Sequence, residues 1–130
     1  MTDSATGRRA LVCVVDDDPS MREALPDLLD ELGFAAHAYA SPEAFLASEH
    51  LETADALVLD VAMPGMTGPD LQEELKRRGY GIPIVFITAH NDDAVPARLI
   101  KQGAVACLLK PFSDTALGVA VMGALGTRLN

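Results

Sequence analysis

Short apolar segments recur along the chain, and each one ends abruptly at a charged residue or a turn former. Such segments are typical of strands that are buried on both faces of a parallel sheet. The segment at residues 34–39 alternates loosely between apolar and polar positions, which favours an edge strand. The predicted strands cover residues 10–15, 34–39, 56–60, 82–89 and 104–109.

Between the strands, apolar residues recur with the spacing of helices that bury one face. The predicted helices cover residues 19–32, 41–49, 68–79, 92–102 and 113–125. Two start signals compete at the first helix. Either Asp18 is the N-cap before Pro19, or Ser20 and Glu23 form a capping box. Pro26 lies inside this helix and removes one backbone hydrogen bond, which predicts a kink or a cost of about 3 kcal/mol.

Two other helices begin at recognisable caps. Ser41, which a proline follows, and Ser113 are the expected N-caps of the second and last helices. Gly118 and Gly123 weaken the last helix by about 1 kcal/mol each, and we expect this helix to end near residue 125.

Five strands alternating with five helices predict a doubly wound α/β domain with a parallel sheet. Right-handed crossovers leave few topologies, and the flavodoxin-like strand order 2-1-3-4-5 is the common one. Residues 1–9 are polar and without pattern, so we expect a flexible tail there and a single domain over residues 10–130.

Composition narrows the class of protein. Of the 130 residues, 49% are hydrophobic and 22% are charged, as in globular domains. The net charge of −9 argues against direct nucleic-acid binding, because phosphate backbones attract basic surfaces. No apolar stretch approaches the roughly 20 residues that cross a membrane, and the N-terminus lacks a signal-peptide pattern, so we expect a cytoplasmic protein. Cys13 and Cys107 lie in apolar runs and are predicted to be buried, reduced thiols.

Polar side chains follow four of the five predicted strands. Asp16 and Asp17 come after the first strand, and Asp60 ends the third. Thr88 lies at the end of the fourth strand, and Lys110 comes after the fifth. Because the carboxyl ends of parallel strands lie at one edge of a sheet, three acids, a hydroxyl and an ammonium are expected to share one pocket.

Three neighbouring carboxylates repel one another, and a hard cation relieves this repulsion. Mg²⁺ prefers oxygen ligands and is usually held by one or two carboxylates together with phosphate oxygens. With the metal in place, one carboxylate can act as a nucleophile toward phosphorus. The hydroxyl and the ammonium are suited to bind the oxygens of the transferred phosphoryl group.

These residues and their surroundings resemble the receiver domain of two-component response regulators over nearly the whole chain. The resemblance rests on V-V-D-D-D at 14–18, L-D-V-A-M-P-G-M-T-G at 59–68, F-I-T-A at 86–89 and L-K-P-F at 109–112. It implies a phosphoacceptor signalling domain that takes a phosphoryl group from a histidine kinase or phosphotransfer protein, or from a small donor such as acetyl phosphate. It also implies that the domain catalyses only its own phosphorylation and dephosphorylation.

The resemblance assigns a role to each matching position. Asp60 is expected to be the phosphoacceptor, with Asp17 as a direct Mg²⁺ ligand and Asp16 as a ligand through water. The backbone carbonyl of Ala62 is expected to complete the protein's share of the metal site. Thr88 and Lys110 are expected to contact the phosphoryl group, and the family typically has a cis peptide bond before Pro111.

Three positions depart from the family pattern or modulate it. Cys107 stands where the family often has Tyr or Phe, and a thiol is too small for the same packing change. We therefore expect Thr88 to move on phosphorylation and the signal to pass through the loop at 89–93 and neighbouring aliphatic residues. Ala62 and His90 occupy positions that influence the lifetime of the phosphoryl group in this family: Ala62 has no side chain to orient water, and His90 either orients or obstructs it.

Other interpretations stay open at this point. An aspartate-nucleophile phosphohydrolase of the haloacid-dehalogenase type is disfavoured. Such enzymes require a second Asp as acid/base at the position where this chain has Ala62. A flavin-binding module of the same fold is disfavoured by the acids after the first strand. A pseudo-receiver that signals without phosphorylation remains an alternative. The chain is expected to be either a stand-alone receiver or the N-terminal part of a transcription factor.

The face built from the fourth helix, fifth strand and fifth helix often mediates dimerisation in this family. Here that face contains apolar residues, which predicts a contact surface and an optional homodimer. The residues on which this prediction rests are Val95, Leu99, Val105 and Val119.

Overall fold

Strands and helices alternate along the chain in the computed structural model, which describes residues 9–89 and 94–129. The strands are β1 (Leu11–Val15), β2 (Ala35–Tyr39), β3 (Ala56–Asp60), β4 (Ile84–Thr88) and β5 (Ala106–Leu109). The helices are α1 (Pro19–Glu31), α2 (Pro42–Leu46), α3 (Gly68–Arg77), α4 (Ala94–Lys101) and α5 (Asp114–Leu129). In the described part of the chain, no helix is both long and apolar enough to cross a lipid bilayer.

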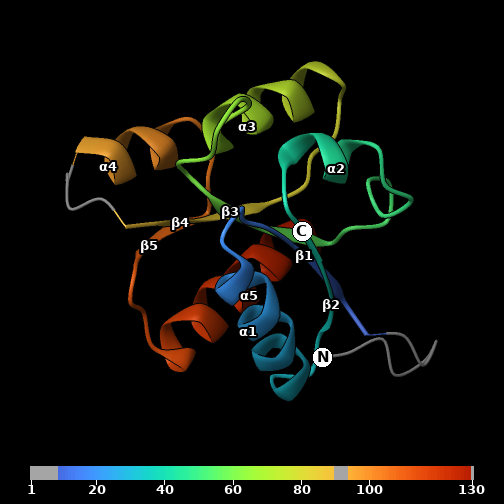
Figure 1. Ribbon diagram of the computed structural model, residues 1–130, viewed down its shortest axis with the longest axis vertical. Coiled ribbons are helices and arrows are strands. Elements are labelled where there is room, and N and C mark those ends of the chain that lie inside the picture. The colour runs from blue at the N-terminus through green and yellow to red at the C-terminus, as the bar shows by residue number, and fades with distance from the viewer. Residues whose placement is uncertain (1–8, 90–93, 130) are drawn as a thin grey trace.

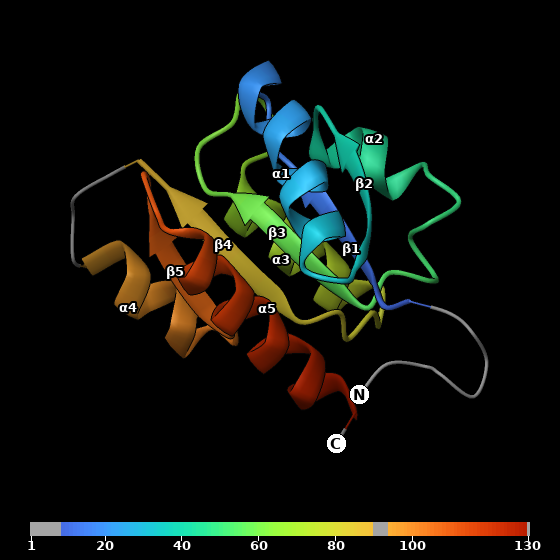
Figure 2. The same cartoon turned by 90° about the horizontal axis from the view of Figure 1, so that it is seen from below.

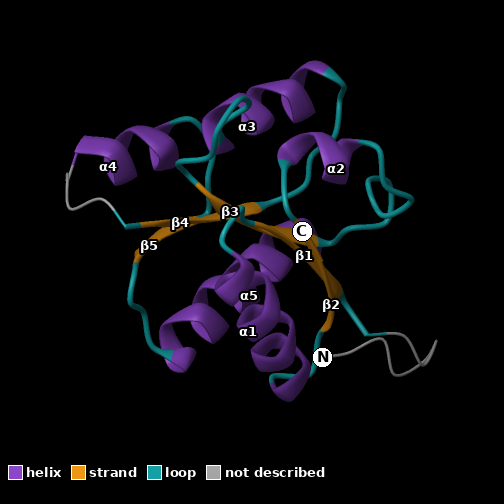
Figure 3. Ribbon diagram, viewed as in Figure 1, coloured by secondary structure: helices purple, strands orange, loops and turns teal. Residues whose placement is uncertain are grey.

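The five strands form one parallel sheet in the order β2-β1-β3-β4-β5, so the predicted fold class and strand order are confirmed. Helices α2, α3 and α4 cover one face of the sheet, and α1 and α5 cover the other (Figure 1). The three layers are also distinct when the chain is coloured by secondary structure (Figure 3). Strand β2 lies at an edge, as its loose alternation predicted.

Each face of the sheet has its own hydrophobic core, and successive residues of β3 contribute to the two cores in turn. Leu57 and Leu59 pack against the helices on the α2–α4 side, whereas Ala56 and Val58 pack on the α1–α5 side. The main helix residues on the first side are Phe45, Leu71, Leu75 and Leu99. Those on the second side are Leu25, Leu29, Leu117 and Val121. Burial on both faces explains why this strand is apolar throughout until Asp60.

The structure decides between the two start signals of α1. The carboxylate of Asp18 accepts a hydrogen bond from the amide of Ser20 at 2.9 Å, so Asp18 is the N-cap. Pro26 is accommodated within α1 without ending it. At α3, the cap is Thr67, which forms a capping box with Asp70; the sequence interpretation began this helix at Gly68 and missed the cap.

Several predicted boundaries were wrong. Helix α2 ends at Leu46 instead of 49, because the amide and the hydroxyl of Ser48 both donate to the carbonyl of Phe45 and turn the chain. Strands β4 and β5 each begin two residues later than predicted. Residues 92 and 93 of the predicted fourth helix lie outside the described residues.

The last helix is longer than predicted and continues to Leu129. Ser113 begins it as predicted, because its hydroxyl accepts a hydrogen bond from the amide of Ala116 at 3.0 Å. The glycines that were expected to weaken the helix have room for a Cβ atom, which at Gly123 would lie 3.9 Å from Val105. A Cβ atom at Gly118 would make an ordinary van der Waals contact with Leu32, at 3.6 Å, in the segment after α1.

The two cysteines are free thiols, as predicted, but they differ in burial. Cys13 in β1 is fully buried, and burial, reinforced by the charge of Asp55, raises its pKa to about 12. Cys107 is only partly buried, which corrects the prediction for this residue. The reason is its position in β5, which has a neighbouring strand on one side only.

Arg9 closes the C-terminal end of α1, although the sequence places this residue in the tail. Its guanidinium donates hydrogen bonds to the carbonyls of Asp30, Gly33 and Phe34 at 2.8–3.1 Å. It also contacts the carboxylate of Asp30 at 2.8 Å. The carbonyl of Asp30 belongs to the last turn of α1, and those of Gly33 and Phe34 lie in the turn that leads to β2, so Arg9 fastens the chain before β1 to both segments.

Replacing Arg9 by alanine is expected to lower the free energy of unfolding by about 1 kcal/mol, because three carbonyl contacts are lost. Urea denaturation monitored by circular dichroism measures this loss. The Asp30→Asn variant removes only the exposed ion pair and is expected to cost less than about 0.5 kcal/mol. Equal losses in the two variants would show that the carbonyl contacts contribute nothing.

Candidate functional site

The polar side chains that the sequence singled out lie at the carboxyl ends of four strands. Asp60 is the last residue of β3, and Thr88 is the last residue of β4. Asp16 follows β1 directly, and Lys110 follows β5. Because every strand pairing is parallel, these positions share one edge of the sheet, where the arrowheads of β3 and β4 lie in Figure 2.

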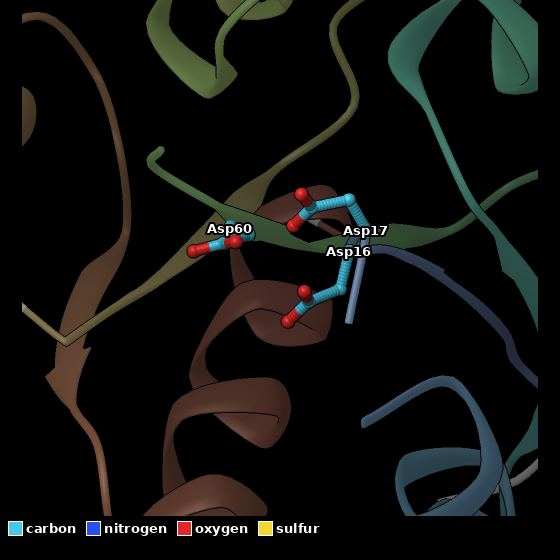
Figure 4. A group of neighbouring side chains, drawn as sticks. All are labelled: Asp16, Asp17 and Asp60. Atoms are coloured by element: carbon cyan, nitrogen blue, oxygen red, sulfur yellow. The ribbon is translucent and has the colours of Figure 1, made fainter. Parts of the chain in front are cut away.

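Three carboxylates gather at this edge. Oxygen atoms of Asp16, Asp17 and Asp60 all lie within 4.8 Å of one another. Figure 4 shows them grouped where β1 and β3 end. Asp16 is fully buried and Asp60 is 6% exposed, whereas Asp17 is exposed to solvent. The cluster is thus open to solvent on the side of Asp17 and enclosed by protein on the side of the other two acids.

Lys110, which follows β5, places a positive charge next to the three carboxylates. Its Nζ atom lies 3.3 Å from a carboxylate oxygen of Asp16 and 3.7 Å from one of Asp60. The Lys110 side chain is itself only 22% exposed. One ammonium therefore faces three carboxylates, and the cluster keeps an excess of negative charge.

Asp16 is held in place by its surroundings. Its second carboxylate oxygen accepts a hydrogen bond from the amide of Asp18 at 2.9 Å. Its own amide donates to the carbonyl of Tyr39 at 3.1 Å. Its carbonyl accepts from the guanidinium of Arg22 at 3.1 Å. The sequence interpretation missed Arg22, because a single arginine in the second turn of a helix carries no signal of its own.

The environment of Asp60 disfavours its ionised form. Burial is the main cause, and the negative charge of Asp16 adds to it; together they outweigh the opposing charge of Lys110 and raise the pKa of Asp60 to about 6. A hydrogen bond with Asp16 and the charge of Asp17 act in the same direction as burial. A positive charge placed among these carboxylates would reverse this shift.

The donor set fits a hard divalent cation. Carboxylate oxygens are the ligands that Mg²⁺ takes, and it usually keeps several waters, for which the exposed side of Asp17 leaves access. Asp16, Asp17 and Asp60 are the residues that could hold the ion. Ala62, whose carbonyl the sequence interpretation added to this set, lies in the loop after β3 and is exposed.

The loop after β3 is tied back onto the sheet next to Asp60. The amide of Val61 donates to the carbonyl of Ile87 at 3.0 Å, and the amide of Gly68 donates to the carbonyl of Val61 at 3.0 Å. Gly68 is buried directly against the main chain of Asp60: a Cβ atom there would lie 2.3 Å from the Asp60 carbonyl oxygen. The α3 N-terminus and the acidic residue are therefore in rigid contact.

The remaining predicted residues lie around this cluster. Thr88 is buried beside β3, since its strand pairs with β3 up to Asp60. Cys107 is opposite Phe86 in the β4–β5 pairing and packs at the border of the α2–α4 core. The Lys110–Pro111 peptide bond is cis. His90 lies outside the described residues.

Comparison with known proteins gives a consistent result. Residues 12–122 match the family model "Response regulator receiver domain". The chain is 44% identical over 116 residues to nodulation protein W of Bradyrhizobium diazoefficiens, covering 89% of this chain and 51% of that protein. It is 37% identical over 118 residues to the response regulator protein TodT of Pseudomonas putida, covering 91% and 52%. The chain thus spans about half the length of these curated relatives.

Solved structures show the same fold at substantial identity. The response regulator StyR superposes with a TM-score of 0.85 at 44% identity, covering 93% of this chain and 61% of that one. FixJ-N superposes with a TM-score of 0.82 at 35% identity, covering 92% and 95%. The family model matches most of the chain, and the strand order agrees with the fold of these neighbours. The chain therefore belongs to the family of response regulator receiver domains.

Proposed function

We propose that this domain accepts a phosphoryl group on Asp60 from a histidine kinase or a phosphotransfer protein and passes the signal on by protein contact. The observation that carries the proposal is the acidic cluster with its single ammonium: three carboxylates within 4.8 Å, and Lys110 within 3.7 Å of two of them. Aspartate nucleophiles for phosphorus require this combination of a metal site, a free carboxylate oxygen and a cation for the phosphoryl oxygens.

Asp60 forms the new bond in this scheme. A carboxylate oxygen attacks phosphorus while the bond from phosphorus to the leaving nitrogen of the donor phosphohistidine breaks, and the imidazole leaves with the electron pair. The attacking carboxylate must be ionised, which its environment resists, since the pKa of Asp60 is raised to about 6. Mg²⁺, when bound, supplies positive charge that favours the ionised carboxylate and offsets the negative charge of the phosphoryl oxygens.

The neighbouring residues position the reaction. Asp17 is the exposed acid and is suited to bind the metal directly, whereas buried Asp16, already bonded to Asp18 and Lys110, is suited to bind it through water. The Ala62 carbonyl completes this set. Lys110 exchanges its carboxylate contacts for a phosphoryl oxygen, and the hydroxyl of Thr88 takes another.

Two features bear on the lifetime of the phosphoryl group and on the response to it. Ala62 is exposed and has no side chain to orient a water, and His90 is the second residue that we expect to influence hydrolysis. Because Cys107 lacks an aromatic ring, we propose that a shift of Thr88 is transmitted through the aliphatic residues that pack around β4 and β5 instead.

The face of α4, β5 and α5 is the surface that we propose for contact with a partner or a second copy. The sequence interpretation chose the wrong residues for it: Leu99 is buried, Val95 and Val105 are partly buried, and only Val119 is exposed. All three elements nevertheless expose large apolar side chains. These are Ile100 in α4, Leu109 in β5, and Val119 and Met122 in α5.

We place the domain in the cytoplasm, where the two free thiols, Cys13 and Cys107, stay reduced. Its activity is restricted to its own phosphorylation and dephosphorylation. A phosphohydrolase would turn over a phosphate ester and release phosphate repeatedly, whereas a receiver retains one phosphoryl group per chain.

Incubation of the protein with acetyl phosphate and Mg²⁺ is expected to add one phosphoryl group per chain, measured by intact mass spectrometry and by a phosphate-affinity gel. Chelation of the metal is expected to suppress the reaction, because the clustered carboxylates then repel the donor. The Asp60→Asn variant is expected to remain unmodified.

Asp18→Asn is the matched control. Asp18 is adjacent in sequence to the acidic cluster but serves as the N-cap of α1, a role that asparagine also fills. This variant is expected to be modified as the wild type is. A folded wild-type protein that takes up no phosphoryl group would favour a pseudo-receiver, and continuous phosphate release from an ester would favour a phosphohydrolase.

A further inference from the structure

Arg22, near the start of α1, contacts the chain on both sides of Asp17. Its guanidinium donates a hydrogen bond from Nη1 to the carbonyl of Asp16 at 3.1 Å. Its main-chain amide donates to the carbonyl of Asp18, also at 3.1 Å. The exposed acid of the cluster, Asp17, is therefore flanked by two residues that the same partly buried arginine holds.

The carbonyl of Asp16 depends on this arginine. Strand β1 pairs with its two neighbours only as far as Val15, so Asp16 lies just beyond the paired part of the sheet. Within the residues that the structure describes, no main-chain amide donates to this carbonyl, and the guanidinium of Arg22 is its donor. Asp16 is fully buried, and a buried carbonyl without a donor is costly. Loss of the arginine would therefore favour a different orientation of this carbonyl.

The peptide group that carries this carbonyl joins Asp16 to Asp17. Because a peptide group is planar, holding its oxygen also sets the direction in which the main chain enters Asp17. Asp17 itself forms no hydrogen bond with any other described residue. The carboxylate of Asp16, by contrast, is also held by the amide of Asp18 and by Lys110. Figure 4 shows the two acidic side chains leaving the chain next to each other, so a rotation of the peptide between them would displace Asp17 in particular.

The positive charge of Arg22 cannot explain a favourable effect on metal binding. A guanidinium has no lone pair to offer a metal ion. Its charge repels a divalent cation, so by charge alone the arginine would weaken the binding of Mg²⁺. Its contribution through geometry has the opposite sign, because it keeps a metal ligand in place. The two contributions can therefore be separated by experiment.

We propose that Arg22 is a positioning residue for the metal site, which holds the peptide group between Asp16 and Asp17 so that Asp17 meets the other two carboxylates. The proposal rests on the metal site that the proposed function assigns to Asp16, Asp17 and Asp60. It adds a residue that contacts neither the metal nor the phosphoryl group. Removal of a partner that orients metal ligands typically weakens metal binding about 10–100-fold. The lower end is expected here, because Asp16 keeps its other contacts.

Titration of the protein with magnesium chloride, followed by the chemical shifts of its amides, measures the affinity for Mg²⁺. Arg22→Met removes the donor and the charge but keeps much of the apolar stem. This variant is expected to bind Mg²⁺ about tenfold more weakly than the wild type. Arg22→Lys keeps the charge and one group that can donate to the carbonyl, so it is expected to bind more tightly than Arg22→Met. An effect of charge alone would reverse this order.

A second measurement separates positioning from a general loss of stability. Urea denaturation in a buffer with a chelator gives the free energy of unfolding without metal, whereas the titration reports on the folded protein. If Arg22 only stabilised the fold, Arg22→Met would unfold more easily and bind Mg²⁺ as the wild type does. Arg98→Met is the matched control, because Arg98 is exposed on α4, which covers the other face of the sheet. This control is expected to bind Mg²⁺ with wild-type affinity.

Three results would decide against the positioning role. Binding of Mg²⁺ by Arg22→Met that equals or exceeds that of the wild type would overturn it, and so would an equal loss in Arg98→Met. If Arg22→Met does not fold, Arg22→Gln takes its place, since its uncharged side chain is two bonds shorter than that of arginine. A wild-type protein that binds no Mg²⁺ would contradict the proposed function itself, on which the metal site depends.

Discussion

The Asp60→Asn variant is expected to be more stable than the wild-type protein in the absence of metal, by about 2–3 kcal/mol at pH 8. In the folded state, burial and the charge of Asp16 raise the pKa of Asp60 from 3.8 to about 6. Above pH 6 the carboxylate is ionised in both the folded and the unfolded state, so the folded state bears the full cost of the buried charge. An asparagine removes this charge and keeps the volume.

The stabilisation depends on pH with a defined sign. As the pH falls from 6 to 4, the folded wild-type protein takes up a proton at Asp60 that the unfolded chain does not yet bind, and the wild type recovers stability relative to the variant. The difference is expected to vanish below about pH 4. Urea denaturation of both proteins at several pH values, in a buffer with a chelator, measures this difference in the free energy of unfolding.

Asp27→Asn is a suitable control, because Asp27 lies exposed on α1 and its replacement removes a charge that water already solvates. This variant is expected to follow the wild-type curve at every pH. Unfolding curves of the Asp60→Asn variant that run parallel to the wild type from pH 8 to pH 4 would contradict the electrostatic account of the pocket. Saturation of the wild type with Mg²⁺ is expected to reduce the advantage of the variant, because the ion binds the folded state.

Replacing Gly68 by alanine is expected to lower the free energy of unfolding by about 3 kcal/mol or more, the upper range for overpacking a buried site. The new Cβ atom would lie 2.3 Å from the carbonyl oxygen of Asp60 and 3.0 Å from the ring of Phe86. The nearest obstacle is main chain, which cannot rotate away as a side chain can. The start of α3 and the end of β3 must therefore separate, which also displaces the phosphoacceptor that we propose.

Gly126→Ala provides a matched change elsewhere. Gly126 lies in α5 and a Cβ atom there would meet nothing within 4 Å, so this variant is expected to gain up to about 1 kcal/mol from helix propensity. Thermal and urea denaturation of the two variants measure the contrast. A Gly68→Ala protein as stable as the wild type would mean that the loop after β3 adjusts freely, contrary to the rigid contact seen here.

The architecture was predictable because its signals are local and repeated. Each central strand is apolar on both faces, as Ala56–Asp60 shows, and such runs have few interpretations other than a covered parallel sheet. The parallel sheet then places its strand ends at one edge, so Asp16 and Asp60 could be predicted to meet although 44 positions separate them. The motifs around these residues also predicted the family, and the family model confirms this prediction.

Features that depend on contacts between distant segments were not predictable in this way. The position of Arg9 depends on the carbonyls of Asp30, Gly33 and Phe34, and the partial burial of Cys107 follows from the edge position of β5. The stacking of His37 on His50 also requires β2 and the following loop to be in place.

The amino-acid sequence by itself determined the order of elements, the strand order and the membership of the acidic pocket, because hydrophobic periodicity and strand ends are properties of neighbouring residues. Only the tertiary structure decided that Nζ of Lys110 lies 3.3 Å from a carboxylate oxygen of Asp16 and 3.7 Å from one of Asp60. Only the tertiary structure, likewise, shows why position 68 must be glycine. Differences of a few tenths of an ångström in such distances result from the packing of the whole core, to which every element contributes. No local sequence pattern encodes them.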